Sequence, residues 1–283
     1  DSGGNTTITQ LTGDITLSLA SILANVIYDV WVLDPSVNSG SIGLELLAWK
    51  KVTASNSPTS GSSKTININD TTGIANGSVV TVRDGSNNQI ATVTSFVSNT
   101  SITVASLATA FTTPDVYFPN TRATAVTRTN GTWYKNADVT RRYAGTIRGS
   151  AGGQCTDAAN QRLCWNWANQ RDKRLYTTDG TNSWAYSSAS WRAARNQTTL
   201  GSTSSARVEF VIGLAEEWVE ASYTSVVDPG GGTGIAVGIA MDSSSAPDIA
   251  AYCTGAAGSW QFSPIARFQW APSVGFHFIN GME

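Results

Sequence analysis

The chain has 283 residues, of which 41% are hydrophobic and only 13% are charged, and its formal net charge at pH 7 is −2. This length allows one large or two small domains, and the near-zero charge provides no overall field to attract nucleic acid or an anionic membrane. Soluble domains carry roughly 25% charged residues. In this chain Ser, Thr, Asn and Gly are abundant where charged residues are few, and these residues favour strands and turns.

The first fifty residues read as a small meander of strands. Residues 1–13 are polar and are expected to be peripheral. Apolar and polar residues then alternate with a period of two over 14–19 and 26–32, which predicts two strands. A turn at 37–41 leads into a third predicted strand over 42–49.

Residues 51–65 are rich in Ser and Thr, and their composition predicts a flexible linker. Four short alternating runs follow, which predict strands over 65–68, 78–83, 89–95 and 101–105. A hairpin loop is expected at 84–88, between the second and third of these strands. Residues 51–120 are therefore expected to form a small β-barrel-like module, close to the lower size limit for an independent core.

From residue 121 onward short strands return. The clearest signal is a hairpin in which residues 122–128 and 132–135 flank the turn at Asn130 and Gly131. Further strands are predicted over 144–148, 163–167, 183–187, 206–214, 219–227, 234–241 and 271–279. No long amphipathic helix is predicted, so the expected fold is all-β, with a β-sandwich or jelly-roll-like main domain. No apolar run reaches the ~18 residues of a membrane span, so no membrane insertion is expected.

Residues with catalytic or metal-binding chemistry are sparse. His277 is the single histidine of the chain, so a His-based metal site is excluded and a Ser-His-Asp triad would depend on this residue alone. The three cysteines, Cys155, Cys164 and Cys253, match no zinc motif. Buried thiols are the favoured interpretation, although a Cys155–Cys164 bridge across a hairpin stays open. No metal and no cofactor are expected.

A pair of carboxylates can form a glycoside-hydrolase site, because such enzymes use two acidic residues. Glu216, Glu217 and Glu220 lie close together in the sequence. On a strand, however, Glu216 and Glu217 point to opposite faces, so solvated edge charges are the favoured interpretation. The sequence therefore predicts a protein that is not an enzyme.

Cations and aromatic rings are interleaved between residues 141 and 195. Such patterns occur at subunit interfaces, where Arg, Trp and Tyr are enriched, and at surfaces where rings stack on sugars. Nucleic acid is disfavoured by the net charge. The candidates for glycan or subunit contact are Trp184, Tyr186, Trp191, Arg192 and Arg195.

Several short motifs occur in a characteristic order. The two most distinctive are a strand containing Arg141, Arg142, Tyr143 and Gly145, and an aromatic strand containing Trp165, Asn166 and Trp167. This order resembles bacteriophage virion proteins of the tail-fibre and head-fibre type. In these proteins the counterparts of Glu45–Trp49 and Thr121–Ala125 are almost adjacent. The resemblance thus implies that 51–120 is an insertion and that 1–50 and 121–283 form one discontinuous main domain.

The resemblance implies a structural protein of the virion, either a tail fibre or a capsid-associated fibre or decoration protein. Such a protein would assemble in the host cytoplasm with other virion proteins and face outward on the virion surface. A homotrimer is expected, and contact with host-surface glycans is a further expectation. Two alternatives stay open: a secreted bacterial carbohydrate-binding or adhesin module, and a fibre-borne polysaccharide depolymerase.

Overall fold

The computed structural model describes residues 15–85, 87–168, 172–180, 184–200, 205–215, 218–228, 234–254 and 261–283. Within these residues the strands form four sheets, and all strand pairs are antiparallel except one short parallel pair. Two three-residue 3₁₀ turns, Pro35–Val37 and Ala194–Asn196, accompany them. The chain is therefore all-β and sandwich-like, which confirms the predicted fold class.

The first sheet has the order β2-β1-β11-β10-β9, and β13 pairs with the second half of β11. Its strands are β1 (Ile27–Leu33), β2 (Gly43–Ala48), β9 (Val126–Thr129), β10 (Thr132–Lys135), β11 (Asp138–Arg148) and β13 (Cys164–Asn166). The turn between β9 and β10 has φ values of +50° at Asn130 and +81° at Gly131. Both values are left-handed, as a type I′ turn requires, so the predicted hairpin is confirmed.

The second sheet has the order β12-β14-β19-β16-β17, and a third sheet consists of β15 and β18. Their bounds are β12 (Gln161–Arg162), β14 (Arg207–Ile212), β15 (Val219–Thr224), β16 (Gly234–Met241), β17 (Ile249–Thr254), β18 (Ile265–Trp270) and β19 (Gly275–Met282). The β15–β18 pair packs over β16, β17 and β19, as in a sandwich of two sheets.

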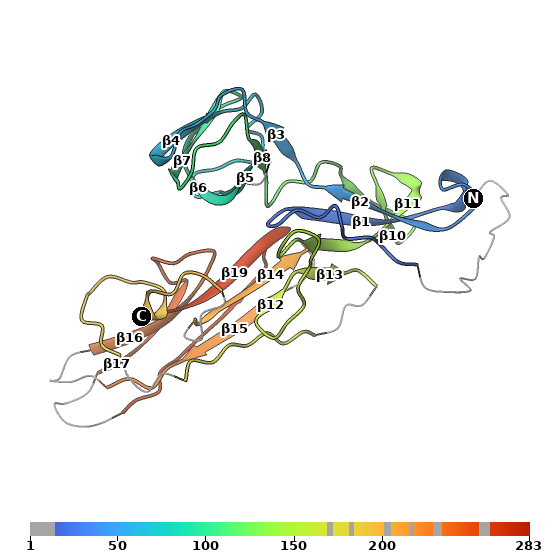
Figure 1. The fold of residues 1–283 in the computed structure, drawn as a ribbon. Helices are drawn as coiled ribbons and strands as arrows, with labels where there is room; N and C mark the ends of the chain where they lie inside the picture. Colours follow the sequence, from blue (N-terminus) through green and yellow to red (C-terminus); the bar gives the residue numbers. More distant parts are fainter. Residues whose placement is uncertain are drawn as a thin grey trace.

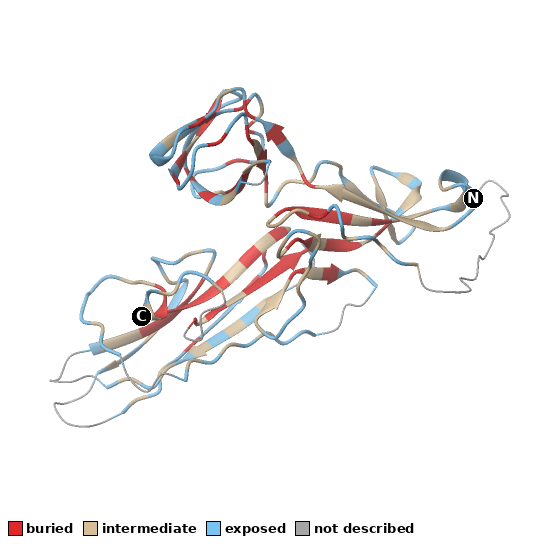
Figure 2. Cartoon of the chain, viewed as in Figure 1, coloured by how far each residue is buried: buried red, intermediate tan, exposed pale blue. Residues whose placement is uncertain are grey.

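One apolar cluster joins these three sheets. It includes Trp31 of β1, Trp165 of β13, Phe210 of β14, Ile239 of β16 and Trp270 of β18, all of them buried. Figure 2 shows buried residues following the lengths of β1, β14 and β19. Because a sheet is stable only when one face is covered, this shared cluster holds the sheets together.

Residues 51–118 form a separate six-stranded sheet with the order β3-β8-β5-β6-β7-β4. The strands are β3 (Lys51–Thr53), β4 (Gly61–Asn67), β5 (Val79–Asp84), β6 (Asn87–Val97), β7 (Ser101–Leu107) and β8 (Asp115–Tyr117). The Ser55 N–H donates to the Asn67 carbonyl over 2.9 Å, which links the end of β3 to β4 and closes the sheet into a small barrel. Every residue of its core cluster comes from 52–118.

The barrel projects as its own lobe in Figure 1, joined to the other sheets by two neighbouring segments of the chain, residues 49–50 and 118–125. Lys50 makes two backbone hydrogen bonds at this junction, one from its N–H to the Thr121 carbonyl over 3.0 Å and one from the Phe118 N–H to its own carbonyl over 2.9 Å. The entry and exit of the barrel are thus adjacent, as they must be for a module placed in a loop. Independent folding of residues 51–120 stays a prediction.

Two predicted strands are absent from the part of the chain that the structure describes. Residues 15–19 alternate in polarity, yet they form no strand. Both edges of the neighbouring β1 are already paired, with β2 and β11, so no edge is left there. Residues 184–187 also form no strand. The Trp184 indole N–H donates to the Glu283 carboxylate, and the Tyr186 hydroxyl donates to the Ser190 carbonyl.

The flexible linker predicted for 51–65 is wrong, because β3 and β4 occupy most of it. Its polar side chains are used in pairing: the Thr53 hydroxyl donates to Asp115, and the Asn56 side chain bonds the backbone of Thr65 and Asn67. The predicted loop at 84–88 is tighter than expected, since Asp84 pairs with Asn87. Strands β3, β8, β12, β17 and β18 were not predicted.

Candidate surface-contact site

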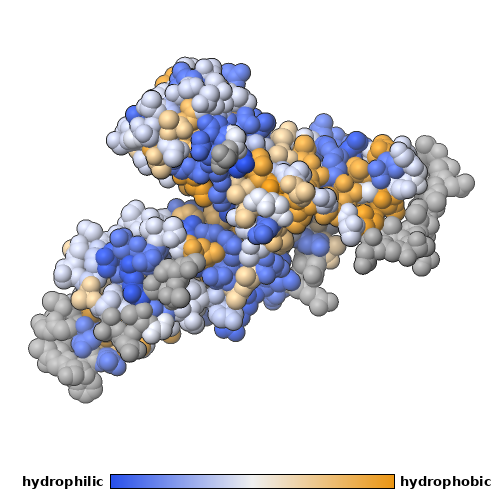
Figure 3. All heavy atoms as spheres, viewed as in Figure 1, coloured by the Kyte–Doolittle hydropathy of each residue, from blue (hydrophilic) through white to orange (hydrophobic). Residues whose placement is uncertain are grey.

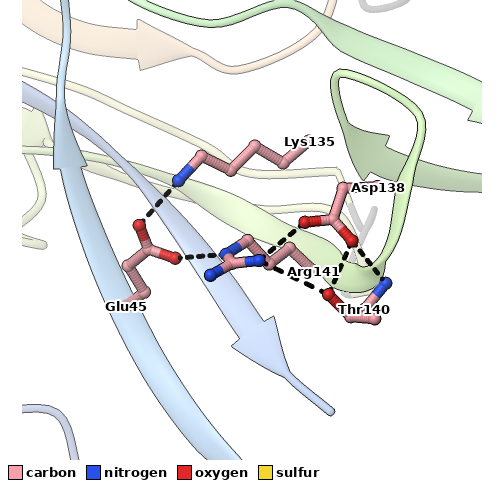
Figure 4. Close-up of polar contacts among 5 residues, drawn as sticks. All are labelled: Glu45, Lys135, Asp138, Thr140 and Arg141. Atoms are coloured by element: carbon pink, nitrogen blue, oxygen red, sulfur yellow. Dashed lines mark hydrogen bonds and ion pairs between the residues drawn. The ribbon is translucent and has the colours of Figure 1, made fainter. Parts of the chain in front are cut away.

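The strand with the Arg-Arg-Tyr motif, β11, places its side chains alternately on the two faces of the first sheet. Arg141 lies among acidic groups: its Nε donates to Glu45 over 3.0 Å and one terminal nitrogen to Asp138 over 2.6 Å. Figure 4 shows Lys135 reaching the other oxygen of Glu45, over 2.6 Å. The hydrogen bonds from Thr140 and the Arg141 ion pair lower the pKa of Asp138. The network therefore ties β2, β10 and β11 together.

Arg142, the next residue, is exposed. It lines a pocket of about 150 Å³ at the end of β1, together with Asp34, Pro35, Ile42 and Val139. The Asp34 side chain accepts the Ser36 N–H over 2.9 Å, and this bond, aided by Arg142, lowers the pKa of Asp34. Arg142 and Asp34 thus give the pocket one cationic and one anionic wall.

Tyr143 belongs to a buried polar group inside the shared core. Arg122 makes an ion pair with Asp29 over 2.8 Å and donates to the Tyr143 hydroxyl over 3.1 Å and to the Gly213 carbonyl. Asp29 is only 2% exposed. Burial, followed by the nearby Asp29 charge, raises the pKa of Tyr143. Arg122 also lies over the Trp49 ring, 4.9 Å from its centroid. This group links β1 to β11 and to the end of β14.

The remaining motif residues fix the pairing of β11 with β13. Gly145 faces Asn166, and a side chain at this glycine would overlap the Trp165 carbonyl. Trp165 is buried, with its ring 5.9 Å from that of Tyr143. Trp167 packs edge-on against Trp133 at 6.2 Å, while the exposed Asn166 side chain accepts the Ala168 N–H. The motif is therefore largely a packing motif.

The residues expected to contact a glycan or a subunit converge around Glu283. Arg192 donates to Glu283 over 2.7 Å, the Arg195 N–H donates to it over 2.8 Å, and the Trp184 indole N–H donates to its other oxygen. The Arg192 guanidinium stacks on the Tyr186 ring at 3.7 Å. The structure thus brings together four of the five candidates into what we call the Glu283 cluster: Trp184, Tyr186, Arg192, Arg195 and Glu283.

Trp191 is held apart from this cluster. Its ring edge lies against Gly238 of β16, where a Cβ atom would be 3.3 Å from it. Within the cluster, Trp184 is 38% exposed, so part of its ring is open to contact, while the Arg195 guanidinium lies over the ring at 5.6 Å from its centroid. The guanidinium groups already have partners, since Arg195 also pairs with Asp179 over 3.0 Å. The cluster can therefore present the Trp184 ring to a ligand, while the guanidinium groups of Arg192 and Arg195 are held in place by their acidic partners.

The other acidic and basic candidates have structural partners. Glu220 pairs with Arg267 on the exposed β15–β18 face, over 2.6 Å. Glu216 and Glu217 lie outside the described residues. His277 is buried and bonds Asp242 over 2.7 Å through Nδ1 and the Ser273 carbonyl over 2.8 Å through Nε2. Among the described residues no group of three or more His, Cys, Asp or Glu is arranged to hold a metal ion.

Two determinants of these sites escaped sequence reasoning. Glu283 is the last residue of the chain and carries no motif, so its role appears only once β19 pairs with residues 192–193. Asp29 was assigned only to a strand, although a carboxylate alternating with apolar residues in a buried strand is a signal for an ionic partner. Arg122, 93 positions away, is that partner.

Comparisons with known proteins identify no relative: no family model, no curated protein and no solved structure matches the chain. In the described residues no helix has the length and apolar character needed to cross a membrane.

Proposed function

We propose that the chain is a structural component of a bacteriophage virion, a tail fibre or a capsid-associated fibre or decoration protein, displayed outward as a homotrimer. It acts without enzymatic chemistry and assembles with other virion proteins in the host cytoplasm. The ordered motifs around Arg141 and Trp165 support the assignment. Their side chains pack β11 against β13 and tie β11 to the neighbouring strands. The carboxylates Asp29, Glu45 and Glu283 all pair with arginines, in keeping with structural roles.

The observation that carries the proposal is a set of exposed apolar side chains on the strands of the outer sheets. Soluble monomers rarely expose large contiguous apolar areas, and such areas mark interaction surfaces. Tyr252 is 74% exposed and Ile265 64% exposed. The exposed set lies on or beside β15, β17 and β18 and comprises Trp218, Val226, Ile249, Tyr252, Ile265 and Phe268. Tyr252 follows the core residue Ala251 in β17, and Ile265 precedes the core residue Ala266 in β18. Because these strands belong to two different sheets, Tyr252 and Ile265 point outward from opposite faces of the sandwich.

A second apolar area supports self-association. Figure 3 shows hydrophobic residues gathered over the region of β1 and β2. Strand β2 is an edge of its sheet and carries Leu44 and Leu46, both half-buried. Exposed edge strands with apolar side chains pair readily with another chain unless they are covered. Contact between copies would cover them.

Sedimentation equilibrium of the purified chain tests this assembly. The expected mass is three times the chain mass of 29.8 kDa. Tyr252→Lys combined with Ile265→Lys should shift the mass toward the monomer, because each new charge would be buried at one of the contacts between copies. Val97→Lys is the matched control, since Val97 is 60% exposed but lies on β6 of the barrel. A monomeric wild-type chain at micromolar concentration would contradict the trimer.

Contact with host glycans is the second part of the proposal and rests on the Glu283 cluster. A tryptophan ring offers a flat apolar surface on which a sugar can stack. Because one stacking site binds weakly, useful affinity would come from several copies on one particle. The fixed guanidinium of Arg192 beside the ring of Tyr186 would add orientation.

Binding of the purified protein to host cells tests the glycan contact. Trp184→Ala removes both ring and N–H, whereas Trp184→Phe keeps a stacking ring and loses only the hydrogen bond to Glu283. Binding should fall in the Ala variant and be largely kept in the Phe variant, at equal melting temperature. Trp191→Ala, outside the cluster, should bind as wild type. Equal binding by all variants would remove the glycan site.

The two alternative functions give different results in the same preparations. A secreted carbohydrate-binding or adhesin module would sediment near 29.8 kDa and would not band with phage particles in a density gradient. A polysaccharide depolymerase would release reducing sugar from host polysaccharide. The proposed virion protein should band with particles in many equal copies and release none.

A further inference from the structure

We infer that Cys155 and Cys164 form a disulfide bond when the chain meets an oxidising thiol–disulfide environment, and that Cys253 stays free. All three thiols are unbridged in the structure. The pairing follows from the hairpin that connects β11 to β13, whatever the role of the whole chain.

The backbone of this hairpin sets the register. Asp157 and Arg162 form an antiparallel bridge. On one side of it the Ala158 N–H donates to the Gln161 carbonyl over 2.7 Å, and on the other the Leu163 N–H donates to the Thr156 carbonyl over 2.8 Å. Counting two residues outward from the bridge places Cys155 directly opposite Cys164.

The type of pair is also favourable. Hydrogen-bonded and non-hydrogen-bonded pairs alternate along an antiparallel ladder. The Ala158–Gln161 and Thr156–Leu163 pairs carry the hydrogen bonds, so Asp157–Arg162 and Cys155–Cys164 are non-bonded pairs. In such pairs the Cα atoms are about 4.5 Å apart, which lies within the range of about 4.4–6.8 Å that a disulfide spans.

The two sulfur atoms already face each other. They are 2.7 Å apart, and the Cys155 Sγ is also 3.2 Å from the Leu163 carbonyl oxygen. Both residues are partly exposed, so a small oxidant can reach them. The contact with the Cys155 thiol lowers the pKa of Cys164 despite its burial. A thiolate at Cys164 is therefore stabilised by the Cys155 thiol beside it.

The reaction with glutathione disulfide proceeds in two exchanges. The Cys164 thiolate attacks one sulfur of glutathione disulfide, forming a mixed disulfide and releasing one glutathione thiolate. Cys155 then loses its proton and attacks the Cys164 sulfur, releasing the second glutathione. Two protein thiols are oxidised to one disulfide, and one glutathione disulfide is reduced to two glutathione molecules.

The Cys155–Cys164 disulfide would link the two arms of the hairpin covalently, next to the residue at which the hairpin enters the core. Leu163 is fully buried, and its carbonyl accepts the Arg148 N–H over 2.8 Å at the end of β11. Cys164 itself pairs with Ile147 of β11. A chain folded in a reducing cytosol would thus gain a covalent link beside its first sheet after reaching an oxidising exterior.

Thiol counting on the full chain tests the inference. Reduced protein is equilibrated with a glutathione redox buffer, denatured, labelled with a maleimide and weighed by mass spectrometry. We expect one label per chain instead of three, with an unlabelled mass lower by about 2 Da because two hydrogens are lost. Trypsin cleaves after Arg162, between the two cysteines, so the bridge should appear as two peptides joined by a disulfide.

Single variants assign the pair. Cys253→Ser should leave no labelled thiol after oxidation, whereas Cys155→Ser and Cys164→Ser should each leave two. Three labels on the folded wild-type chain at equilibrium with excess glutathione disulfide would overturn the inference. So would a linked peptide that contains Cys253.

Discussion

The Phe118 N–H donates to the Lys50 carbonyl over 2.9 Å, so the strand that leaves the small barrel lies beside the strand that enters it. The two ends of residues 51–118 are therefore close enough to be joined by a short link. All members of the barrel core cluster come from residues 52–118, and none comes from the other sheets.

Replacing residues 52–119 by a short Gly-Ser link should therefore leave a folded protein. All ten tryptophans lie outside this segment, so tryptophan fluorescence reports only on the remainder. We expect a native, blue-shifted emission and a cooperative melt at a somewhat lower temperature, because Tyr117 leaves its buried contact with Ile22, Val26 and Tyr28.

The reciprocal control is the isolated 51–119 fragment, which should show strand-type circular dichroism and its own melting transition. Emission at the wavelength of the urea-unfolded chain in the deletion variant would show that the barrel is required for folding of the main domain.

Arg122→Met should strongly destabilise the chain. The variant leaves the Asp29 carboxylate, 2% exposed, without its cationic partner, and breaking a buried ion pair from one side costs about 3–5 kcal/mol. Urea unfolding measures the free energy. Arg267→Gln is the control, since that arginine pairs with Glu220 on the surface with its side chain 67% exposed, and exposed pairs contribute about 0–1 kcal/mol. Similar losses in both variants would argue against a special role for the buried pair.

Gly145→Ala should disturb the pairing of β11 with β13. The new methyl group would overlap the Trp165 carbonyl, and overpacking of this kind costs about 1–3 kcal/mol. Gly152→Ala, with no atom within 4 Å of the added carbon, should be close to neutral. The comparison is made by thermal unfolding, and a stable Gly145→Ala protein would show that the strands can separate there without loss.

His277 should make stability depend on pH. Burial opposes a charge on the ring, but the hydrogen bond and the charge of Asp242 outweigh it, so the pKa of His277 is raised above its usual value. A pKa that is higher in the folded state stabilises the protein below about pH 6.5, the unfolded value. This contribution is lost as the pH rises through the folded pKa.

The free energy of unfolding of wild type relative to His277→Gln should therefore be larger at about pH 5.5 than at about pH 8.5. Asp242→Asn should remove most of that difference, because it takes away the partner of the charged ring. A gap between wild type and His277→Gln that does not change with pH would contradict this assignment.

The fold class could be predicted because local signals and packing agree. Asn130 and Gly131 adopt the left-handed conformations that a type I′ turn needs, and this pair, together with the runs that flank it, predicts the hairpin. Alternating polarity did not predict strands correctly where the pairing depends on a partner strand far away in the sequence. Residues 15–19 alternate without pairing, whereas β17 and β18, with weaker patterns, are strands because β16 and β15 supply their partners.

The candidate site was predictable only in part, for the same reason. The aromatic and cationic residues between 184 and 195 are visible in sequence, but the residue that gathers them is Glu283, about ninety positions away. Likewise the ring of Trp191 was grouped with Trp184 by proximity in sequence, yet it packs on Gly238 of β16. No local sequence pattern predicts contacts between segments that are far apart in the chain.

The most direct test of the proposed function is electron microscopy of native phage particles from the host culture, labelled with an antibody raised against this chain. The proposal predicts label at a defined place on the outside of intact particles, in several copies, with none on the envelope of uninfected cells. Label confined to the bacterial surface or the medium, with bare particles, would contradict the virion assignment.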